Sequence, residues 1–170
     1  MRMRNGNSHK REHSFSIGVL GIDATAEGPF MKGKQASYLI NYRYSSLGLL
    51  DQMNIVDFDG IPIYQDLSFK VVVPTPKAGT FNLFGLGGDS RINQGVEKDD
   101  NPGALVEKAT FSSGLGVVGL NHTYQFNEKA YIVSSVSAAY NNSGYHEEDL
   151  NAETNQYHEA YNDDLNKIYL

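Results

Sequence analysis

The chain has no cysteine and no tryptophan among its 170 residues. Without cysteine it can form neither a disulfide framework nor a thiolate metal site. Cysteine usage therefore does not indicate whether the protein resides in an oxidising or a reducing compartment. It also lacks an apolar run that approaches the roughly 18 residues of a transmembrane helix. This absence excludes helical membrane proteins only, because the strands of a membrane barrel alternate apolar and polar residues and pass unseen through a hydropathy window.

Basic residues are scarce as well. Fourteen Lys and Arg stand against 20 Asp and Glu, for a net charge of −6, and the basic residues cluster only in the opening stretch MRMRNGNSHKRE. This distribution is not that of a nucleic-acid-binding surface, so no nucleic-acid partner is expected. The opening stretch has no apolar h-region after its charges, since Asn5 to Ser14 are polar nearly throughout. We therefore expect no signal peptide within this chain.

Aromatic residues and glycine are abundant: the chain has 11 Tyr, 8 Phe and 17 Gly. Its hydrophobic share of 40% is a little below the roughly 45–50% of globular domains. Together with many Ser, Thr and Asn, this composition favours β structure with turns over helices. The length suffices for one ordinary domain with its own core.

Two segments alternate cleanly between apolar and polar residues, around QASYLINYRYSS and in YQDLSFKVVVP (Tyr64 to Pro74), and each predicts a strand that is apolar on one side. Further strands are predicted in His13 to Phe30, from Phe81, in Ala109 to Phe126 and in Tyr131 to Tyr140, about six in all. NKIYL looks like the beginning of one more. The polar stretches Asp89 to Lys108 and Asn141 to Asp164 are predicted to be long exposed loops, and PTPKAGT and FNEKA tight turns.

The predicted connections alternate between short and long along the chain. This is the layout of an outer-membrane barrel, with short periplasmic turns and long extracellular loops. The fold class predicted is therefore all-β: an antiparallel up-and-down meander forming part of a transmembrane β-barrel. Tyrosines near the predicted strand ends suit an aromatic girdle at the membrane interface: Tyr42, Tyr44, Tyr64, Tyr124, Tyr131 and Tyr140.

The two clean strands supply candidate surfaces. The lipid-facing candidates are Tyr38, Ile40, Tyr42, Tyr44, Leu67, Phe69, Val71 and Val73, and the lumen-facing candidates are Asn41, Arg43, Asp66, Ser68 and Lys70. An ion pair of Asp66 with Arg43 or with Lys70 is feasible across or along the strands. The alternative for the lumen-facing set is that it keeps a barrel wall wet, with no individual role.

Three motifs have features of binding sites. GLGVVG (Gly114 to Gly119) has dinucleotide-loop spacing, but LNHTYQF after it is a poor helix, so glycines within a barrel strand are the better interpretation. DFDG (Asp57 to Gly60) fits a calcium loop only with Ile55 at the first ligand position, which requires oxygen. The acidic, histidine-bearing segments YHEEDLN and YHEAYNDDLN do not match H-E-x-x-H, and an acidic surface loop is favoured over a cation site. No cofactor and no metal are expected.

Nothing indicates catalysis. Ser, His and Asp are present, but no nucleophile elbow of the form G-x-S-x-G occurs. Asp99 and Asp100 lie in a predicted polar loop, where solvation leaves paired carboxylates as ordinary acids. We expect the chain not to be an enzyme.

Four stretches, taken in order, resemble consecutive barrel strands of TonB-dependent outer-membrane receptors, in the branch with an N-terminal carboxypeptidase-regulatory-like domain: KREHSFSIGVLGIDATAEGPF, ASYLINYRYSSLGLL, YQDLSFKVVVPTPKAGTFNLFGLGG and NHTYQFNEKAYIVSSVSAAYNNSGY. The resemblance covers most of the chain. NYRYSSLGLL and YQDLSFKV…P…KAGTF carry it most specifically.

The resemblance implies a plugged barrel of about 22 strands in the outer membrane of a Gram-negative cell, which imports a scarce nutrient with energy from a TonB complex. Residues 1–170 would be an incomplete internal segment of it without plug, TonB box or signal peptide, and MRMRNGN the tail of an earlier strand. The implied partners are outer-membrane lipid, the rest of the barrel and its plug, with the TonB complex reached only through a missing N-terminal part. Such a fragment is not expected to transport alone.

The alternative is a soluble β-rich binding module. In that case the apolar rows led by Tyr38 and Leu67 would be buried against a second layer rather than facing lipid.

Overall fold

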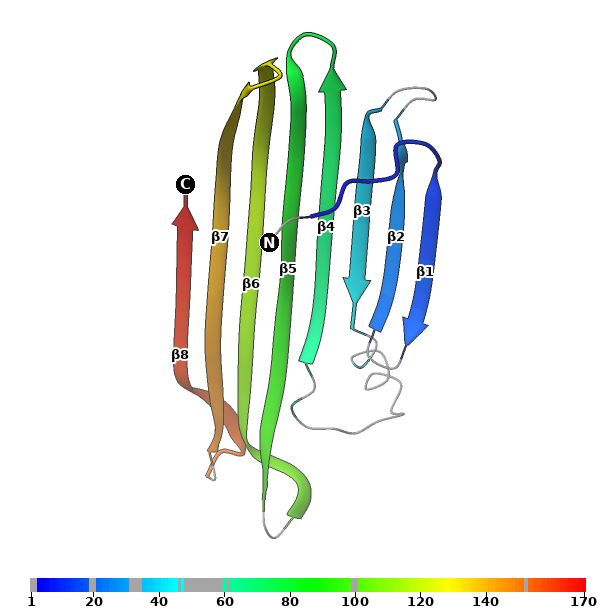
Figure 1. Cartoon of the computed structure of the whole chain (residues 1–170). Helices are drawn as coiled ribbons and strands as arrows, with labels where there is room; N and C mark the ends of the chain where they lie inside the picture. Colours follow the sequence, from blue (N-terminus) through cyan, green and yellow to red (C-terminus); the bar gives the residue numbers. More distant parts are fainter. Residues whose placement is uncertain are drawn as a thin grey trace.

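A computed structural model describes residues 3–18, 21–30, 35–45, 47, 60, 62–98, 101–151 and 153–170. Within these residues eight strands form one antiparallel sheet in which each strand pairs with its neighbours in sequence (Figure 1). The strands are β1 (Glu12–Gly18), β2 (Gly21–Pro29), β3 (Ser37–Tyr44), β4 (Pro62–Thr75), β5 (Gly79–Lys98), β6 (Asn101–Asn127), β7 (Ala130–Asn151) and β8 (Gln156–Tyr169). The prediction of an all-β, antiparallel up-and-down meander is confirmed.

The sheet is a single open layer. In the described part of the chain β1 pairs with β2 alone and β8 with β7 alone, which leaves an edge on each side. Of the hydrophobic side chains described, only Leu39, Val72 and Ala109 are buried. The described residues include no helix that is long and apolar enough to cross a membrane.

The predicted count of about six strands was too low. His13 to Phe30, expected to be one strand, is the hairpin β1–β2, in which Gly18 pairs with Gly21 and Ile17 with Ile22. The apolar residues change from odd to even positions there because the chain turns and brings both rows to the same face of the sheet. NKIYL does not begin a further strand; its first four residues are the end of β8.

The two long loops predicted in the second half of the chain were also wrong. Asp89 to Lys108 and Asn141 to Asp164 are largely strand: β5 runs to Lys98, and β7 runs to Asn151. Both faces of these stretches are largely polar, so the sequence shows no alternation of apolar and polar residues there. They still form strands because the backbone hydrogen bonds of a sheet require only a neighbouring strand. The expected asymmetry of the two ends takes another form, because the hairpins β5–β6 and β7–β8 project beyond the lower end of β4 (Figure 1). The tight turns at 76–78 and 128–129 are confirmed.

The pairing register gives the sheet two faces. The apolar face carries Tyr42, and at the same level across the sheet lie Phe15, Ala24, Leu67, Gly87, Gly116, Tyr140 and Ile168. The polar face carries Asn41 and Arg43 on β3 opposite Ser68 and Asp66 on β4. It is polar mainly over β2–β4, because on β5 and β6 it also carries Phe84, Leu86, Leu115 and Val117.

The apolar face is apolar over a limited band. On β7 the band runs from Ile132 to Tyr140, and on β6 from Phe126 to Gly116. Below the band the same face becomes polar, with Asp89, Arg91, Ser112, Asn142 and Asn166. The projecting hairpins therefore differ in chemistry from the upper part of the same strands.

Residues 3–11, here called the N-terminal strap, do not form a strand. The expectation that MRMRNGN ends an earlier strand is not met over the described residues 3–7. The strap instead crosses in front of β2, β3 and β4 before the chain enters β1 (Figure 1).

Candidate functional site: the polar face of β2–β4

An arginine–aspartate pair lies at the centre of the polar face. Arg43 and Asp66 are directly opposite on β3 and β4. Arg43 Nε lies 3.0 Å from both Asp66 carboxylate oxygens, and its Nη2 lies 2.9 Å from Oδ2. The Arg43–Asp66 contact predicted from the sequence is confirmed. The arginine side chain is 57% exposed, so we expect the pair to stabilise the fold by only about 0.2–1 kcal/mol.

An amide network lies beside this pair. Asn41 Nδ2 donates to Asp23 Oδ2 and to Thr25 Oγ1, both at 2.8 Å. Asp23, Thr25 and Glu27 alternate along β2 on the polar face, where the register sets Asp23 opposite Arg43 and Thr25 opposite Asn41. Sequence reasoning missed these three residues. The alternation of Ile22, Ala24 and Ala26 would have revealed them once β2 was recognised as a separate strand.

Lys70 and Glu27 hold the N-terminal strap against this face. Lys70 Nζ donates to the carbonyl oxygen of Met3 at 2.8 Å. Arg4 donates from both Nη atoms to the Glu27 carboxylate at 2.7 Å. The Glu27 carboxylate is also the main reason that the pKa of Arg4 is raised above its ordinary value. Of the lumen-facing candidates, Asn41, Arg43, Asp66 and Ser68 lie side by side, and Lys70 lies further up β4 beneath the strap.

The lipid-facing candidates lie together on the opposite face. Tyr38, Ile40 and Tyr42 pair with Val71, Phe69 and Leu67, and Tyr44 pairs with Gln65. Val73 continues the row and pairs with Phe81 of β5. Several of these side chains are strongly exposed, Leu67 to 45% for example, as is Val136 on β7 at 68%.

The tyrosines proposed for an aromatic girdle divide between the faces. Tyr42, Tyr44, Tyr124 and Tyr140 lie on the apolar face, near the lower or upper limit of its band. Tyr64 and Tyr131 lie on the polar face, where they pair with Ser90 and Gln125. The expectation of one girdle of six tyrosines was wrong for these two, because strand ends alone do not fix which face a side chain takes.

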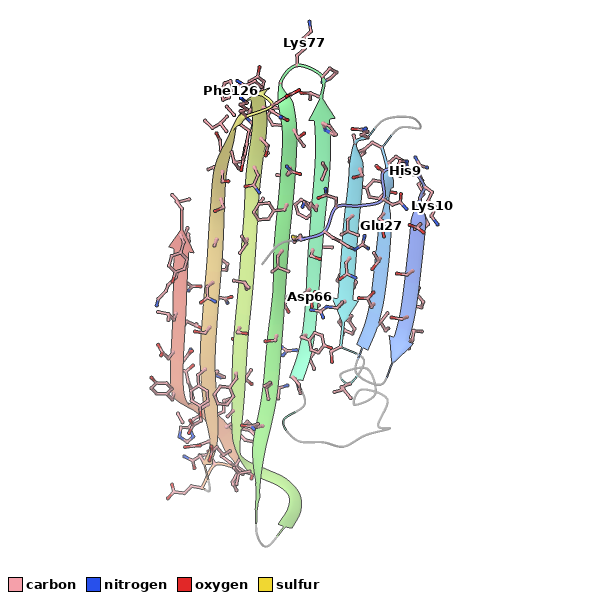
Figure 2. All side chains as sticks on the ribbon, in the orientation of Figure 1. His9, Lys10, Glu27, Asp66, Lys77 and Phe126 are labelled. Atoms are coloured by element: carbon pink, nitrogen blue, oxygen red, sulfur yellow. The ribbon has the colours of Figure 1, made fainter. Side chains whose placement is uncertain are left out.

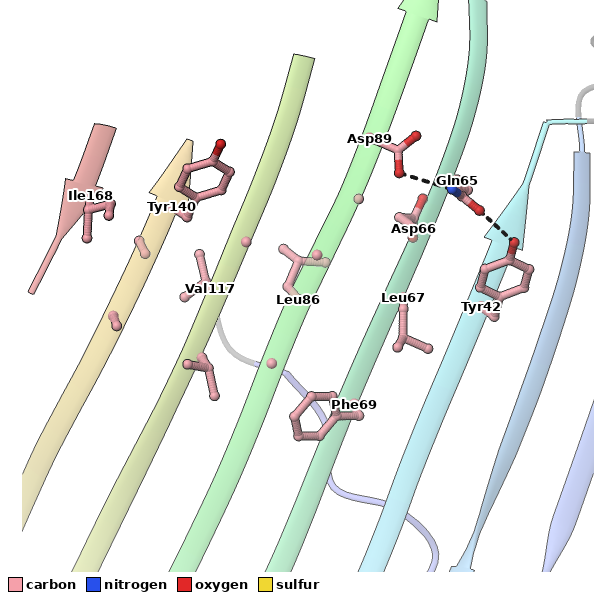
Figure 3. A pocket seen from close by; sticks show the side chains of 17 residues that line it. Tyr42, Gln65, Asp66, Leu67, Phe69, Leu86, Asp89, Val117, Tyr140 and Ile168 are labelled. Carbon is pink, nitrogen blue, oxygen red and sulfur yellow. Dashed lines mark hydrogen bonds between the residues drawn. The ribbon is translucent and has the colours of Figure 1, made fainter. Parts of the chain in front are cut away.

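The apolar band contains a shallow groove of about 690 Å³ (Figure 3). Glycines at one level, Gly87 and Gly116, lie between Leu67 on one side and Tyr140 with Ile168 on the other. A hydrogen-bond chain lies at one end of the groove, drawn uppermost in Figure 3, in which Tyr42 Oη donates to Gln65 Oε1 at 3.0 Å and Gln65 Nε2 donates to Asp89 Oδ1 at 3.0 Å.

The GLGVVG motif is strand throughout. It lies inside β6, which continues to Asn127 without a helix, so it lacks the helix N-terminus that a dinucleotide loop needs. A Cβ built on Gly119 would overlap the ring of Phe84, and one built on Gly114 would meet the side chain of Asn142. Small residues here admit close neighbours, as the sequence interpretation predicted. The DFDG candidate lies outside the described residues except for Gly60.

Acidic and histidine side chains gather in the projecting hairpins. His146 lies 3.7 Å from Glu148 and 3.7 Å from Glu159 on β8, so the two echoed segments do approach each other. They do so as paired strands rather than as the acidic loop predicted. Glu107, Glu147 and Asp149 could each offer an oxygen to a metal ion, but exposed acidic groups of this kind are common without one.

Tyr145 is held on the same hairpin. Its hydroxyl donates to Glu147 Oε2 at 2.5 Å, and its ring contacts Phe111 and Tyr161 at centroid distances of 4.6 and 5.8 Å. The hydrogen bond to Glu147 is the main cause that raises the pKa of Tyr145 to about 12.

Comparison with family models, with curated proteins and with solved structures gave no match to this chain.

Proposed function

We propose that this chain is part of the wall of a TonB-dependent outer-membrane transporter that takes up a nutrient in a Gram-negative cell. Its apolar face meets lipid, and its polar face meets the wet interior of the barrel. The chain forms part of the barrel wall and has no catalytic role. Transport of this kind needs a closed barrel and a plug. By itself the chain does not transport.

The apolar band is the observation that carries this proposal. Ile132 to Tyr140 on β7 is a stretch of about nine residues, the length of a tilted strand that crosses a bilayer core. Aromatic residues lie at both limits, with Tyr42 and Tyr140 below and Phe81 and Tyr124 above. An exposed apolar face of limited height, bounded by aromatic rings, is typical of the outer surface of a membrane barrel.

The position of the N-terminal strap supports the same orientation. In the described part of the chain this segment crosses the polar face, where ion pairs and hydrogen bonds hold it. Polypeptide outside a strand carries backbone groups that lipid cannot satisfy. The face that accepts the strap is therefore suited to a water-filled interior.

The open edges fit a segment of a larger sheet. Within the described residues the outer edges of β1 and β8 pair with no further strand, and an open sheet edge is costly in lipid and prone to association in water. Further strands of the same barrel would pair with both edges, as the resemblance to the receptor family implies.

A soluble β-rich binding module is the second candidate. The observation that favours it is the mixed chemistry of the polar face on β5 and β6, where Phe84, Leu86, Leu115 and Val117 could pack against another layer.

Purification with and without detergent separates the two candidates. For the barrel segment we expect chain made in the cytoplasm to be insoluble in aqueous buffer and to become a strand-rich, folded species on transfer into detergent micelles. A folded monomer with a cooperative thermal transition in buffer without detergent would contradict the proposal and favour the soluble module.

A further inference from the structure

Side-chain contacts hold the N-terminal strap on the polar face of the sheet. Figure 2 shows Glu27 on β2 beneath the strap, with His9 and Lys10 beyond it near the start of β1. Taken as a whole residue, backbone included, Glu27 is only 9% exposed. Its carboxylate accepts hydrogen bonds from Arg4 Nη1 and Nη2 at 2.7 Å and from the backbone N–H of Asn7 at 2.8 Å.

The Arg4–Glu27 pair is asymmetric in burial. The arginine side chain is 60% exposed, and the glutamate side chain is 12% exposed. The carboxylate is part of the β2 surface that the strap covers, and the guanidinium contacts it from the solvent side. A bidentate arginine is the partner that suits a carboxylate so placed, because its two parallel N–H groups match the two oxygens.

Glycine is required where the strap passes β3. A Cβ built on Gly6 would overlap the carbonyl oxygen of Tyr38. That oxygen belongs to a paired strand and cannot give way as a flexible side chain can. Lys70 Nζ contacts the strap backbone at the carbonyl oxygen of Met3, at 2.8 Å. The polar face thus contacts the carbonyl oxygen at position 3 and the guanidinium at position 4, and it leaves no room for a side chain at position 6.

Asn7 ends the bound segment with a turn. Its Oδ1 accepts from the backbone N–H groups of His9 and Lys10 at 2.9 and 3.2 Å, and its Nδ2 donates to Glu12 Oε2 at 2.6 Å. Asparagine side chains commonly stabilise such turns by binding the backbone two residues on. The residue order arginine, any residue, glycine, asparagine therefore has three specified positions: Arg4 at Glu27, Gly6 at the β3 backbone, and Asn7 at Glu27 and Glu12.

Burial and charge complete the site. Ser37, Leu39 and Val72, next to Gly6 and Lys70 on the polar face, are exposed to 2%, 8% and 7%. Residues 3–11 carry Arg4, Lys10 and Arg11, the basic cluster of a chain whose net charge is −6. Arg4 pairs with Glu27 and Lys10 with Glu12, so opposite charges meet along the strap.

We propose that Glu27, Lys70 and the β3 backbone at Tyr38 form a binding site for an extended basic peptide of the pattern Arg-x-Gly-Asn, and that residues 3–11 of the same chain fill it. This site is independent of what the apolar face meets. Because the strap is held by side-chain contacts and joins no strand ladder, a peptide of the same sequence supplied separately competes for the same place.

A labelled peptide of residues 1–11 tests the proposal on the full-length chain. We expect it to bind the Gly6→Val chain, whose own strap cannot seat, at least tenfold more tightly than it binds the wild-type chain. Adding Glu27→Gln to Gly6→Val should weaken binding at least tenfold, whereas adding Arg91→Ala should leave it unchanged. A peptide carrying Gly6→Val should not bind. Equal binding to wild-type and Gly6→Val chains, or binding indifferent to Glu27→Gln, would overturn the proposal.

Amide hydrogen exchange at Asn7 gives a second test that needs no released strap. In the wild-type chain we expect this N–H, bound by Glu27, to exchange at least tenfold more slowly than in the free peptide, and Arg4→Ala to remove most of the protection. Exchange at Asn7 as fast in the wild-type chain as in the free peptide would show that the site is not occupied and would overturn the inference.

Discussion

At the scale of single residues, Tyr145 has the largest pKa shift among the described residues. Its hydrogen bond to Glu147 raises its pKa to about 12, against about 10 for an ordinary tyrosine. The folded pKa lies above the unfolded one, so the hydrogen bond stabilises the folded state fully below about pH 10 and loses this effect as the pH rises through about 12.

We predict that a tyrosinate absorbance titration of the folded chain shows one of the 11 tyrosines ionising near pH 12. Glu147→Gln should bring that step down towards about pH 10, and Glu153→Gln, in the exposed turn before β8, should not. A Glu147→Gln titration that overlays the wild-type curve would contradict this assignment.

The polar-face residues differ in how far sequence can place them. Arg43 and Asp66 could be predicted as a pair because both lie in strongly alternating segments whose apolar residues fix the phase. The pair of Glu27 with Arg4 could not be predicted, since the apolar row of β2 is largely alanine and Arg4 approaches from a segment with no periodicity. A contact between a strand and an irregular segment leaves no pattern in the sequence.

At the scale of elements, side-chain hydrogen bonds and a glycine constrain the β4–β5 turn. Thr75 Oγ1 donates to the carbonyl oxygen of Gly79 at 2.7 Å and accepts from the N–H of Ala78 at 3.1 Å. Gly79 has φ +79°, and a Cβ on it would overlap the carbonyl oxygen of Thr123 in β6. Both the backbone conformation and the space demand glycine.

We predict that Gly79→Ala lowers the free energy of unfolding by about 1–3 kcal/mol, as measured by denaturant unfolding in micelles. Gly18→Ala is the matched control, because among the described residues the nearest atom to its Cβ would be 3.9 Å away, and it should stay within about 0.5 kcal/mol of wild type. Equal effects of the two substitutions would show that the turn is not the constraint described.

The elements also show why half of the sheet was recognisable from the sequence and half was not. β3 and β4 were predicted because apolar residues recur at every second position on one face, with mostly polar residues on the other. The projecting hairpins of β5 to β8 were mistaken for loops because both faces of the sheet carry polar residues there, such as Asp89, Asn142 and Asp163. Strand pairing there depends on backbone hydrogen bonds, which are independent of side-chain type.

At the scale of the whole molecule, the sheet has two unlike faces and hardly any core. Few described hydrophobic side chains are buried, whereas Leu67, Val118, Leu120, Ile132 and Val136 lie exposed on one face. An exposed apolar surface of this extent needs lipid or a second layer. Under the proposed function, lipid covers it.

The most direct test uses the absence of tryptophan from the chain. Leu67 and Ser68 are neighbours on β4 that face opposite sides of the sheet. Leu67→Trp and Ser68→Trp therefore each place a single fluorophore on one face, and brominated lipid in bilayers that contain the folded chain quenches only a tryptophan that touches acyl chains. We predict strong quenching and blue-shifted emission for Leu67→Trp, and weak quenching with red-shifted emission for Ser68→Trp. Equal quenching of both, or stronger quenching at position 68, would contradict the assignment of the apolar face to the membrane.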